Sequence, residues 1–384
     1  MVIKSLQKKI FLVVLLSATS FFARAQQLQQ VNNSKLNLNK GNSGLAGGYD
    51  ASLNDVHPSN GCSMWPKVSI DSVSFNGIIT NSGTNYFPGV TVKLEIYNQS
   101  NALVYSDSSS YSGMNPGATQ QYNVGNYHAA SKGTFTAKAY CIIDGFTDED
   151  NLNDTVDAKF FVNDSIMARD YAIFGDAQDP QTLNDFDTLS KLGNIYTVYK
   201  PDYLTSVYFE LLGAASILDS IRASIYSVTA GVPDQLIART FISPIFVAGS
   251  SSVYNLPLEN GPLLLQPGDY MVCVNEYHGF INLGSTANGF QPLKSWIYYH
   301  EPGAGYDGWY TMESFGASYF RTFTIRPVFG CTLDAQLTVT NETCDKVNGN
   351  IATTVNGASG NISYLWSNGS TNDLIANIAA DRKS

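Results

Sequence analysis

Histidine and cysteine are scarce in this chain of 384 residues, which contains 4 of the first and 5 of the second. It has no Cys-x-x-Cys pair, no His-Glu-x-x-His run, no Gly-x-Ser-x-Gly elbow and no Gly-x-x-x-x-Gly-Lys loop. The usual signatures of zinc sites, thiol redox centres, serine hydrolases and phosphate-binding loops are therefore absent. An enzyme whose catalytic carboxylates are brought together only by the fold is still compatible with this absence.

Charged residues are also few, at 14% of the chain, and positive charge is the scarcer sign, with 22 Lys and Arg against 32 Asp and Glu. Four of the positive residues lie in the first 25 positions, so removal of that segment lowers the formal charge from -10 to -14. So acidic a surface repels phosphate backbones and anionic lipid heads. Nucleic acid is therefore excluded as an expected partner.

Long apolar runs are limited to residues 10–22, which follow a lysine-rich start and precede the small-x-small sequence Ala23-Arg24-Ala25. These 13 residues are too short for the roughly 18 to 20 that span a bilayer, and their order is that of a secretory signal peptide. We expect residues 1–25 to be removed, leaving a secreted or cell-surface protein without a transmembrane segment. Amino-terminal sequencing of the exported protein should therefore begin at Gln26, and a mature chain that kept Met1 would contradict this.

Tyrosine, phenylalanine and glycine are abundant, at 23, 20 and 32 residues, which suits strands and turns. The length predicts two or three domains. We expect an all-β fold of tandem β-sandwiches, in which an immunoglobulin-like module, a larger jelly-roll-like module and an incomplete small β module follow one another. Residues 26–60 are rich in Gln, Asn, Ser and Gly and show little apolar periodicity, so they are expected to form a flexible leader.

Residues 61–164 alternate in the manner of half-buried strands, most clearly over 90–97 and 135–141, and Asn-Ser-Gly, Pro-Gly and Asn-Pro-Gly turns separate the strands. This pattern predicts an immunoglobulin-like sandwich. The module resembles the CARDB-type domain of bacterial surface proteins in Ile79-Thr80-Asn81-Ser82-Gly83, the 90–97 strand, Met114-Asn115-Pro116-Gly117 and Asp150-Asn151-Leu152-Asn153-Asp154-Thr155. A disulfide between Cys62 and Cys141 is one open pairing, and one between Cys331 and Cys344 is another.

An acidic loop at 148–154 offers only oxygen ligands, which is the chemistry that Ca²⁺ requires. It lacks the central Gly and terminal Glu of an EF-hand. A hydrated turn capped by Asx hydrogen bonds is the interpretation we favour, and a structural Ca²⁺ site is the alternative; no other cofactor is expected. The candidate ligands are Asp148, Asp150, Asn151, Asn153 and Asp154.

Residues 165–330 form the longest segment with a continuous strand-and-turn pattern. Period-2 alternation marks strands at 205–211, 221–226 and 270–275, and further candidates lie at 195–199, 236–241, 294–300 and 320–327. The number of strands approaches the eight or so of a jelly roll. We therefore predict a second, larger sandwich.

Two tryptophans and four tyrosines gather between positions 296 and 310, around a Pro-Gly-Ala-Gly turn at 302–305. Aromatic faces stack on sugar rings while carboxylates and imidazoles hydrogen-bond to hydroxyls, so this mixture suits a glycan site. Alternation along the strand places one face of the segment in a core, which is the competing interpretation. The candidate binding residues are Trp296, Tyr298, His300, Glu301, Asp307, Trp309 and Tyr310.

Residues 331–384 change again, to Thr, Asn, Gly and Ser. The order of 337–344, 349–351, 357–360 and 364–369 is similar to the SprB-type repeat of gliding and adhesion proteins of Bacteroidota. The resemblance departs at Asp381-Arg382-Lys383-Ser384, where the family continues into a final strand, so we expect a truncated repeat. Relatives of this type usually end in a sorting domain for type IX secretion, and none is visible.

Three functional classes are open at this stage. The module types favour a non-catalytic adhesion or scaffold protein of the cell surface, whose partners are surface glycans or other surface proteins. The aromatic segment favours glycan binding through the central sandwich. A secreted glycoside hydrolase is the third class, and its loosely available carboxylates are Glu276, Glu301, Asp307 and Glu313. We expect the first of these.

Overall fold

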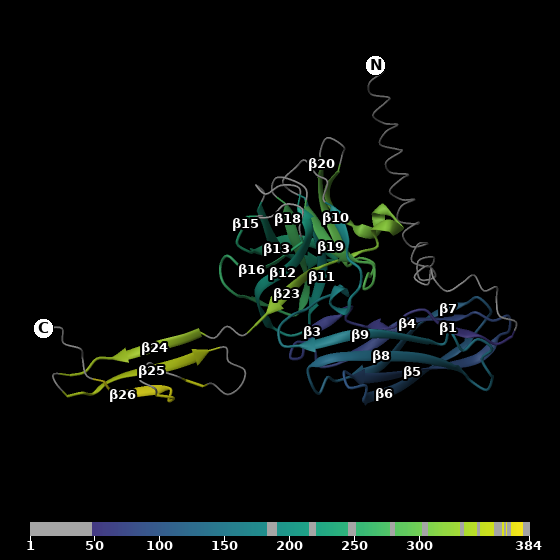
Figure 1. The fold of residues 1–384 in the computed structure, drawn as a ribbon, viewed down its shortest axis with the longest axis horizontal. Coiled ribbons are helices and arrows are strands. Elements are labelled where there is room, and N and C mark those ends of the chain that lie inside the picture. Colours follow the sequence, from purple (N-terminus) through teal and green to yellow (C-terminus); the bar gives the residue numbers. More distant parts are fainter. Residues whose placement is uncertain are drawn as a thin grey trace, which may run out of the picture.

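The computed structural model describes residues 48–182, 190–214, 220–244, 251–276, 281–301, 306–330, 334–343, 346–356, 363–364, 366 and 370–378. They form an all-β chain of tandem β-sandwiches, which confirms the expected fold class (Figure 1). Among these residues, the short 3-10 turns η1 (Ala172–Phe174), η3 (Met312–Phe315) and η4 (Ala317–Tyr319) interrupt the strands. The expected signal peptide lies outside the described residues, whose helical turns are all too short to cross a membrane.

The first sandwich packs a four-stranded sheet against a five-stranded sheet of order β3-β9-β8-β5-β6. Strict alternation drives this packing, since every second residue of β4 is buried. The four-stranded sheet contains β1 (Ala51–Leu53), β2 (His57–Pro58), β4 (Val73–Asn81) and β7 (Thr119–Tyr127). The five-stranded sheet contains β3 (Met64–Pro66), β5 (Phe87–Asn98), β6 (Leu103–Met114), β8 (Gly133–Ile143) and β9 (Thr155–Asn163).

Part of the expected flexible leader belongs to this sandwich. β1 pairs with β4 in antiparallel register and β2 pairs with the same strand further along. Ala51, Leu53 and Val56 are almost fully buried, at 0%, 1% and 2% exposure. The prediction of a leader up to residue 60 was therefore wrong for residues 51–58, because strands of two or three residues are too short to show periodicity and take their stability from the sheet they join.

In the described residues, the central sandwich has two sheets of seven strands each, so the sequence estimate of eight or so strands was too low. Several strands are very short, and periodicity cannot reveal them. One sheet has β10 (Asp179–Thr182), β12 (Asp202–Ala214), β16 (Ser252–Pro257), β17 (Leu263–Leu265), β19 (Ile281–Thr286), β22 (Thr322–Phe323) and β23 (Ile325–Phe329). The other has β11 (Lys191–Val198), β13 (Ser220–Thr229), β14 (Val232–Arg239), β15 (Ser243–Pro244), β18 (Gly268–Glu276), β20 (Ser295–Glu301) and β21 (Tyr306–Thr311).

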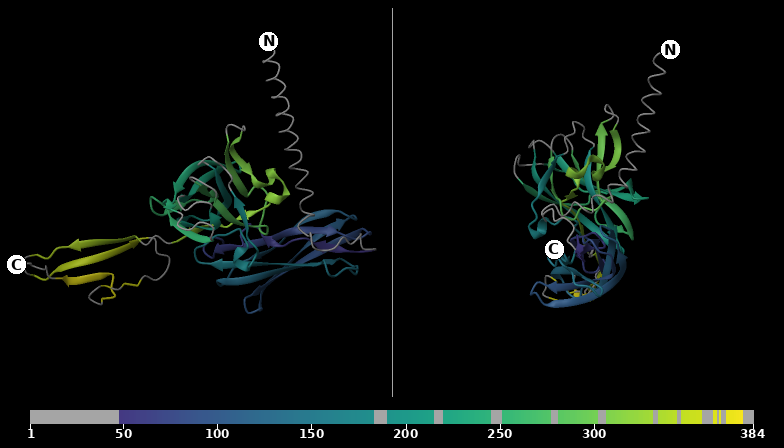
Figure 2. Two further views of the ribbon diagram at one scale, coloured as in Figure 1. Left: turned by 45° about the horizontal axis from the view of Figure 1, so that its top comes forward. Right: turned by 90° about the vertical axis from the view of Figure 1, so that its right-hand side faces the viewer.

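Backbone hydrogen bonds join the two sandwiches, and a single hydrophobic cluster contains residues of both. The backbones of Met64 and Ala168 exchange hydrogen bonds of 3.3 and 2.9 Å. Beside them Asp170, which is fully buried, accepts two hydrogen bonds from the guanidinium of Arg326, at 2.7 and 3.0 Å. Figure 2 shows the first sandwich lying against one end of the central one. This continuity means that the two sandwiches support each other.

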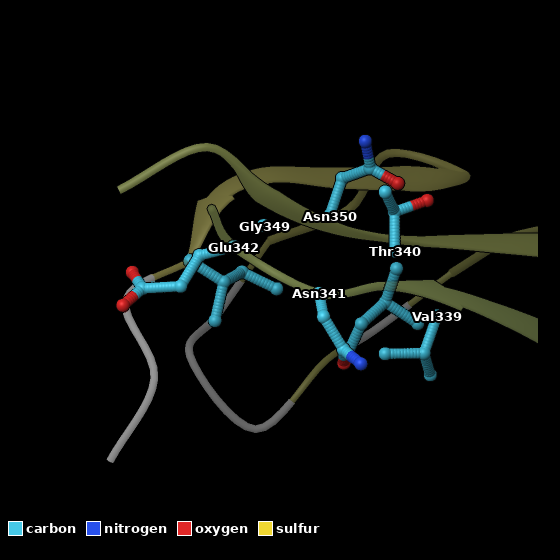
Figure 3. A pocket seen from close by; sticks show the side chains of 8 residues that line it. Val339, Thr340, Asn341, Glu342, Gly349 and Asn350 are labelled. Carbon is cyan, nitrogen blue, oxygen red and sulfur yellow. The ribbon is translucent and has the colours of Figure 1, made fainter. Parts of the chain in front are cut away.

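The C-terminal sheet has β24 (Asp334–Thr340), β25 (Gly349–Asn356) and β26 (Leu374–Ile378), in that order. Its β24 leaves Leu337 and Val339 exposed, at 58% and 60%. A shallow depression lies at one end of the sheet, where Val339, Glu342 and Asn350 border it (Figure 3). Its lining combines the apolar side chains of Val339, Ile351 and Ile378 with the polar side chains of Thr340, Asn341, Glu342 and Asn350.

Candidate functional site

The hairpin of β20 and β21 carries the aromatic segment, and its register decides which side chains share a face. Tyr298 lies opposite Trp309, and His300 lies opposite Asp307. Because directly opposed residues of an antiparallel pair point to the same side, these four side chains form one group. The hairpin thus brings together most of the predicted glycan residues.

Two neighbouring strands extend this group. Lys191 on β11 is the cross-strand partner of Tyr298, and its Nζ lies 4.1 Å from the centre of that ring. Tyr226, on β13, contacts Trp309. We define the aromatic face as Lys191, Tyr226, Tyr298, His300, Asp307 and Trp309. It lies on the side of its sheet that points away from the main core, to which Leu192 and Ile297 turn instead.

A second, smaller hydrophobic cluster borders the aromatic face on the same side of the sheet. It contains Ile195, Met271, Cys273 and Trp296, all exposed by 6% or less, and Tyr226 and Trp309 pack against it. Gly193 is the cross-strand neighbour of both Cys273 and Trp296, and a Cβ there would lie 2.5 Å from the Cβ of Cys273. Only glycine fits this close approach. The buried cluster therefore supports the rings of Tyr226 and Trp309 from one side.

Trp309 is the centre of the aromatic face. Its ring meets Tyr226 at 5.4 Å and 78° and Tyr298 at 5.3 Å and 76°, both edge-to-face contacts. Such contacts hold aromatic rings in place, because the electron-poor edge of one faces the electron-rich surface of the other. All three rings are partly exposed. They present apolar surface to a ligand. Because their neighbours already hold them in place, they lose little side-chain entropy when a ligand binds.

The polar part of the aromatic face is organised around Asp307. One carboxylate oxygen accepts from the Tyr298 hydroxyl at 2.9 Å and interacts with His300 Nδ1 at 3.0 Å. These hydrogen bonds, with His300 first, lower the pKa of Asp307, which is therefore a carboxylate at neutral pH. Burial lowers the pKa of Lys191. The second oxygen of Asp307 and the imidazole of His300 can hydrogen-bond to ligand hydroxyls.

The predicted binding residues divide into three groups. Tyr298, His300, Asp307 and Trp309 belong to the aromatic face, whereas Trp296 is buried beside it, and its indole N–H donates to Leu293 O at 2.9 Å. Tyr310 is opposite Ile297 on the other side of the hairpin and packs on Phe315. The side chain of Glu301 and the turn at 302–305 lie outside the described residues.

Lys191 and Tyr226 were not predicted as site residues. They come from strands that end more than 60 residues before the hairpin begins, since β11 ends at Val198, β13 ends at Thr229 and β20 begins at Ser295. Alternation along β11 and β13 indicates which side chains share a face of one strand, but it does not indicate which strands are neighbours. Sequence periodicity alone could therefore not have found them.

The carboxylates considered for a hydrolase do not form a described pair. The side chains of Glu276 and Glu301 lie outside the described residues. Asp307 bonds to His300 and Tyr298, whereas Glu313 accepts the Leu293 N–H at 2.7 Å and burial raises its pKa. A retaining or inverting glycosidase needs two carboxyl groups facing one bond. The described residues give no such pair.

The acidic loop folds as capped turns, with Asp148 accepting from the Asp150 N–H at 3.0 Å and Asp150 from the Leu152 N–H at 3.2 Å. Asn151 is exposed, Asn153 is partly buried and Asp154 is buried. Among the described residues, no group of three or more His, Cys, Asp or Glu side chains is arranged so that it could hold a metal ion. The Asx-capped turn that we favoured is thus present.

The described cysteines, Cys62, Cys141 and Cys273, are free and buried. Burial raises the pKa of the Cys62 thiol to about 11 and that of Cys273 to about 12, so both are protonated and unreactive at neutral pH. The considered pairing of Cys62 with Cys141 does not form. Cys331 and Cys344 lie outside the described residues.

No protein-family model matches the chain, and no curated protein matches it. Among solved structures, a clostridial cysteine protease after propeptide cleavage is similar at 12% identity and a TM-score of 0.32, over 64% of this chain and 66% of that chain. A CARDB domain of a Pyrococcus furiosus protein in complex with di-metal ions is similar at 12% identity and a TM-score of 0.23, over 30% and 93%.

Carbohydrate-binding modules from the β-sandwich superfamily are similar at 11% identity and a TM-score of 0.20, over 61% of this chain and 95% of that chain. This chain thus spans just under two thirds of the clostridial protease chain. All these TM-scores are below 0.5, so the likenesses assign neither ligand nor activity. One neighbour is a CARDB domain, as the first module's resemblance implied, but the SprB-type repeat and a Bacteroidota origin receive no support.

Proposed function

We propose that this chain is an exported, modular adhesion protein that binds carbohydrate through the aromatic face of its central sandwich. The single observation that supports this is the edge-to-face cluster of Tyr226, Tyr298 and Trp309 beside the hydrogen-bonded pair of His300 and Asp307. Partly exposed rings held by neighbours, next to oriented polar groups, are what recognition of a sugar requires.

The chemistry of the face favours a neutral hexose. The apolar surface of a pyranose ring stacks on an indole, while its equatorial hydroxyls bond to a carboxylate and an imidazole. Lys191 is mostly buried under the ring of Tyr298, so its ammonium is not presented to an anionic sugar. The surface is therefore suited to uncharged oligosaccharides, and the protein would act by attachment and not by cleavage.

Replacing Trp309 by alanine should weaken binding of a glycan, first identified by array screening of the full chain, by about 5- to 150-fold in Kd, because a central aromatic contact contributes about 1 to 3 kcal/mol. Isothermal titration measures the change. The replacement Asp307→Asn should weaken binding less, since the amide keeps the shape and one acceptor but gives up the charge.

A matched control is Tyr319→Ala, which removes an exposed aromatic ring of the same sandwich from η4. It should leave the glycan affinity unchanged. A blank array, or equal losses for Trp309→Ala and Tyr319→Ala, would contradict glycan binding by the aromatic face.

A further inference from the structure

Arg169 lies in the segment that connects the first sandwich to the central one, and it is only 1% exposed. Its Nη2 donates to Gln291 Oε1 at 2.7 Å, whereas its Nε is buried without a hydrogen-bond partner. The ion pairs found among the described residues do not involve Arg169, although the next residue, Asp170, pairs with Arg326. A guanidinium stays charged at every physiological pH. The junction therefore buries a positive charge that no described carboxylate balances.

A second unsatisfied donor belongs to Asn60, which follows β2 and is 7% exposed. Its Oδ1 accepts the Cys62 N–H at 2.9 Å, which closes a tight turn over Gly61, and its Nδ2 is buried without a partner. Gly61 has a φ of 67°, and a Cβ there would lie 2.8 Å from Arg169 Nη1. The guanidinium thus lies against this turn. Both unsatisfied donors therefore belong to side chains next to one glycine.

Two such donors require an acceptor. Buried N–H groups are nearly always satisfied in folded proteins, because a donor taken out of water without a partner loses its hydration. A buried charge that lacks a counter-charge costs more still. A buried water molecule would satisfy the hydrogen bonds but leave the charge unbalanced. A small anion does both.

We propose that Arg169 Nε and Asn60 Nδ2 bind one chloride ion at the junction of the two sandwiches. A carboxylate or phosphate is held best by two parallel N–H groups of one guanidinium. Arg169 offers a single unsatisfied nitrogen, because Nη2 bonds to Gln291 and Nη1 lies against Gly61. One donor from each of two side chains suits an anion of a single atom. The burial of both side chains also favours the smaller ion.

The chloride ion connects parts of the chain that are distant in sequence. Asn60 follows β2 of the first sandwich, and Gln291, which orients the guanidinium of Arg169, lies between β19 and β20 of the central one. The ion thus stabilises the junction beside the buried pair of Asp170 and Arg326. The stability of the chain therefore depends on halide concentration and not on ionic strength alone. This site is separate from the aromatic face.

Thermal melts of the full chain in sodium chloride and in sodium gluconate, at equal ionic strength, test the site. Gluconate screens surface charge equally but is far larger than chloride. A chloride concentration about ten times the Kd should raise the Tm by roughly 3 to 6 °C over gluconate. Crystals soaked in sodium bromide should show an anomalous peak within hydrogen-bonding distance of Arg169 Nε. Equal melts in the two salts would assign the position to water and overturn the proposal.

Asn60→Asp is the sharpest variant, because it keeps the acceptor that caps the turn and replaces Nδ2 by a carboxylate oxygen. That carboxylate supplies the negative charge beside Arg169, so the chloride shift should fall below about 1 °C. The matched control is Asn98→Asp, since Asn98 Oδ1 caps the turn between β5 and β6 by accepting from Ser100 and Ala102 N–H, both at 3.0 Å. It should keep the full shift. An undiminished shift in Asn60→Asp would contradict the site.

Arg169→Met removes the charge and keeps much of the apolar volume of the side chain. It should also lose the chloride shift, because the halide no longer has a cation to neutralise. This variant decides the assignment if Asn60→Asp fails to fold. A chloride shift retained in Arg169→Met would overturn the proposal.

Discussion

Replacing Asp170 by asparagine should lower the free energy of unfolding by about 3 to 5 kcal/mol, the cost of leaving a buried charge without its partner. Asp170 is 0% exposed and accepts both hydrogen bonds of a forked contact from Arg326, whose side chain is 11% exposed. Asparagine keeps the shape but offers one acceptor and no charge, so the guanidinium remains buried and unpaired. Urea unfolding of the full chain measures the loss.

Two further variants separate charge from packing. Asp164→Asn breaks the ion pair with Lys132, in which the side chains are 75% and 53% exposed, and should cost less than about 1 kcal/mol. Combining Asp170→Asn with Arg326→Met also removes the buried guanidinium that Asp170→Asn leaves unpaired, so the double variant should recover part of the lost stability. A loss for Asp170→Asn no larger than that for Asp164→Asn would show that the junction does not depend on this pair.

Replacing Phe160 by alanine should cost about 3 to 5 kcal/mol and lower the Tm of the first sandwich. Phe160 is 0% exposed and is the middle ring of a stack, 5.1 Å from Trp65 and 5.3 Å from Phe135, with planes within 16°. Phe75 and Tyr127 close its sides at 5.5 and 5.9 Å. Because rings enclose Phe160 on all these sides, the surrounding side chains cannot relax far enough to fill the cavity that truncation leaves.

The control for this truncation is Phe146→Ala, which removes a ring that is 41% exposed and stacks on Tyr49 at 4.1 Å. Because one side of that ring faces water, its loss should cost at most about 1 kcal/mol. Differential scanning calorimetry compares the two. Equal shifts in Tm would mean that the stacked rings do not form the centre of the core.

Alternation predicted the long strands well. The 90–97 pattern is confirmed within β5, and those at 205–211, 221–226 and 270–275 are confirmed within β12, β13 and β18. These strands have one face in a core, so the period-2 signal is strong. The hairpin of β20 and β21 also follows the predicted separation of Trp296, Tyr298 and His300 from Ile297.

The remaining features of the fold and of the candidate site depended on pairing between strands that are distant in sequence. No local sequence pattern contains that pairing. Both faces of β20 turned out to be partly covered, so Trp296 is buried although it shares a side with the partly exposed Tyr298. Lys191 and Tyr226 reached the aromatic face from β11 and β13. Site residues that are adjacent in sequence were found, and those supplied by another strand were missed.

β3 and β9 are paired in parallel, with Met64 beside Phe161 and Pro66 beside Asn163. Phe161 N–H donates to Ser63 O, and Lys67 N–H donates to Asn163 O, both at 2.8 Å. Tension that pulls Ser63 toward the amino end and Asn163 toward the carboxyl end slides two parallel strands along each other and loads these bonds at the same time. An antiparallel hairpin pulled at its open end would instead release its bonds one after another. A force applied between Ser63 and Asn163 would therefore load this strand pair in shear.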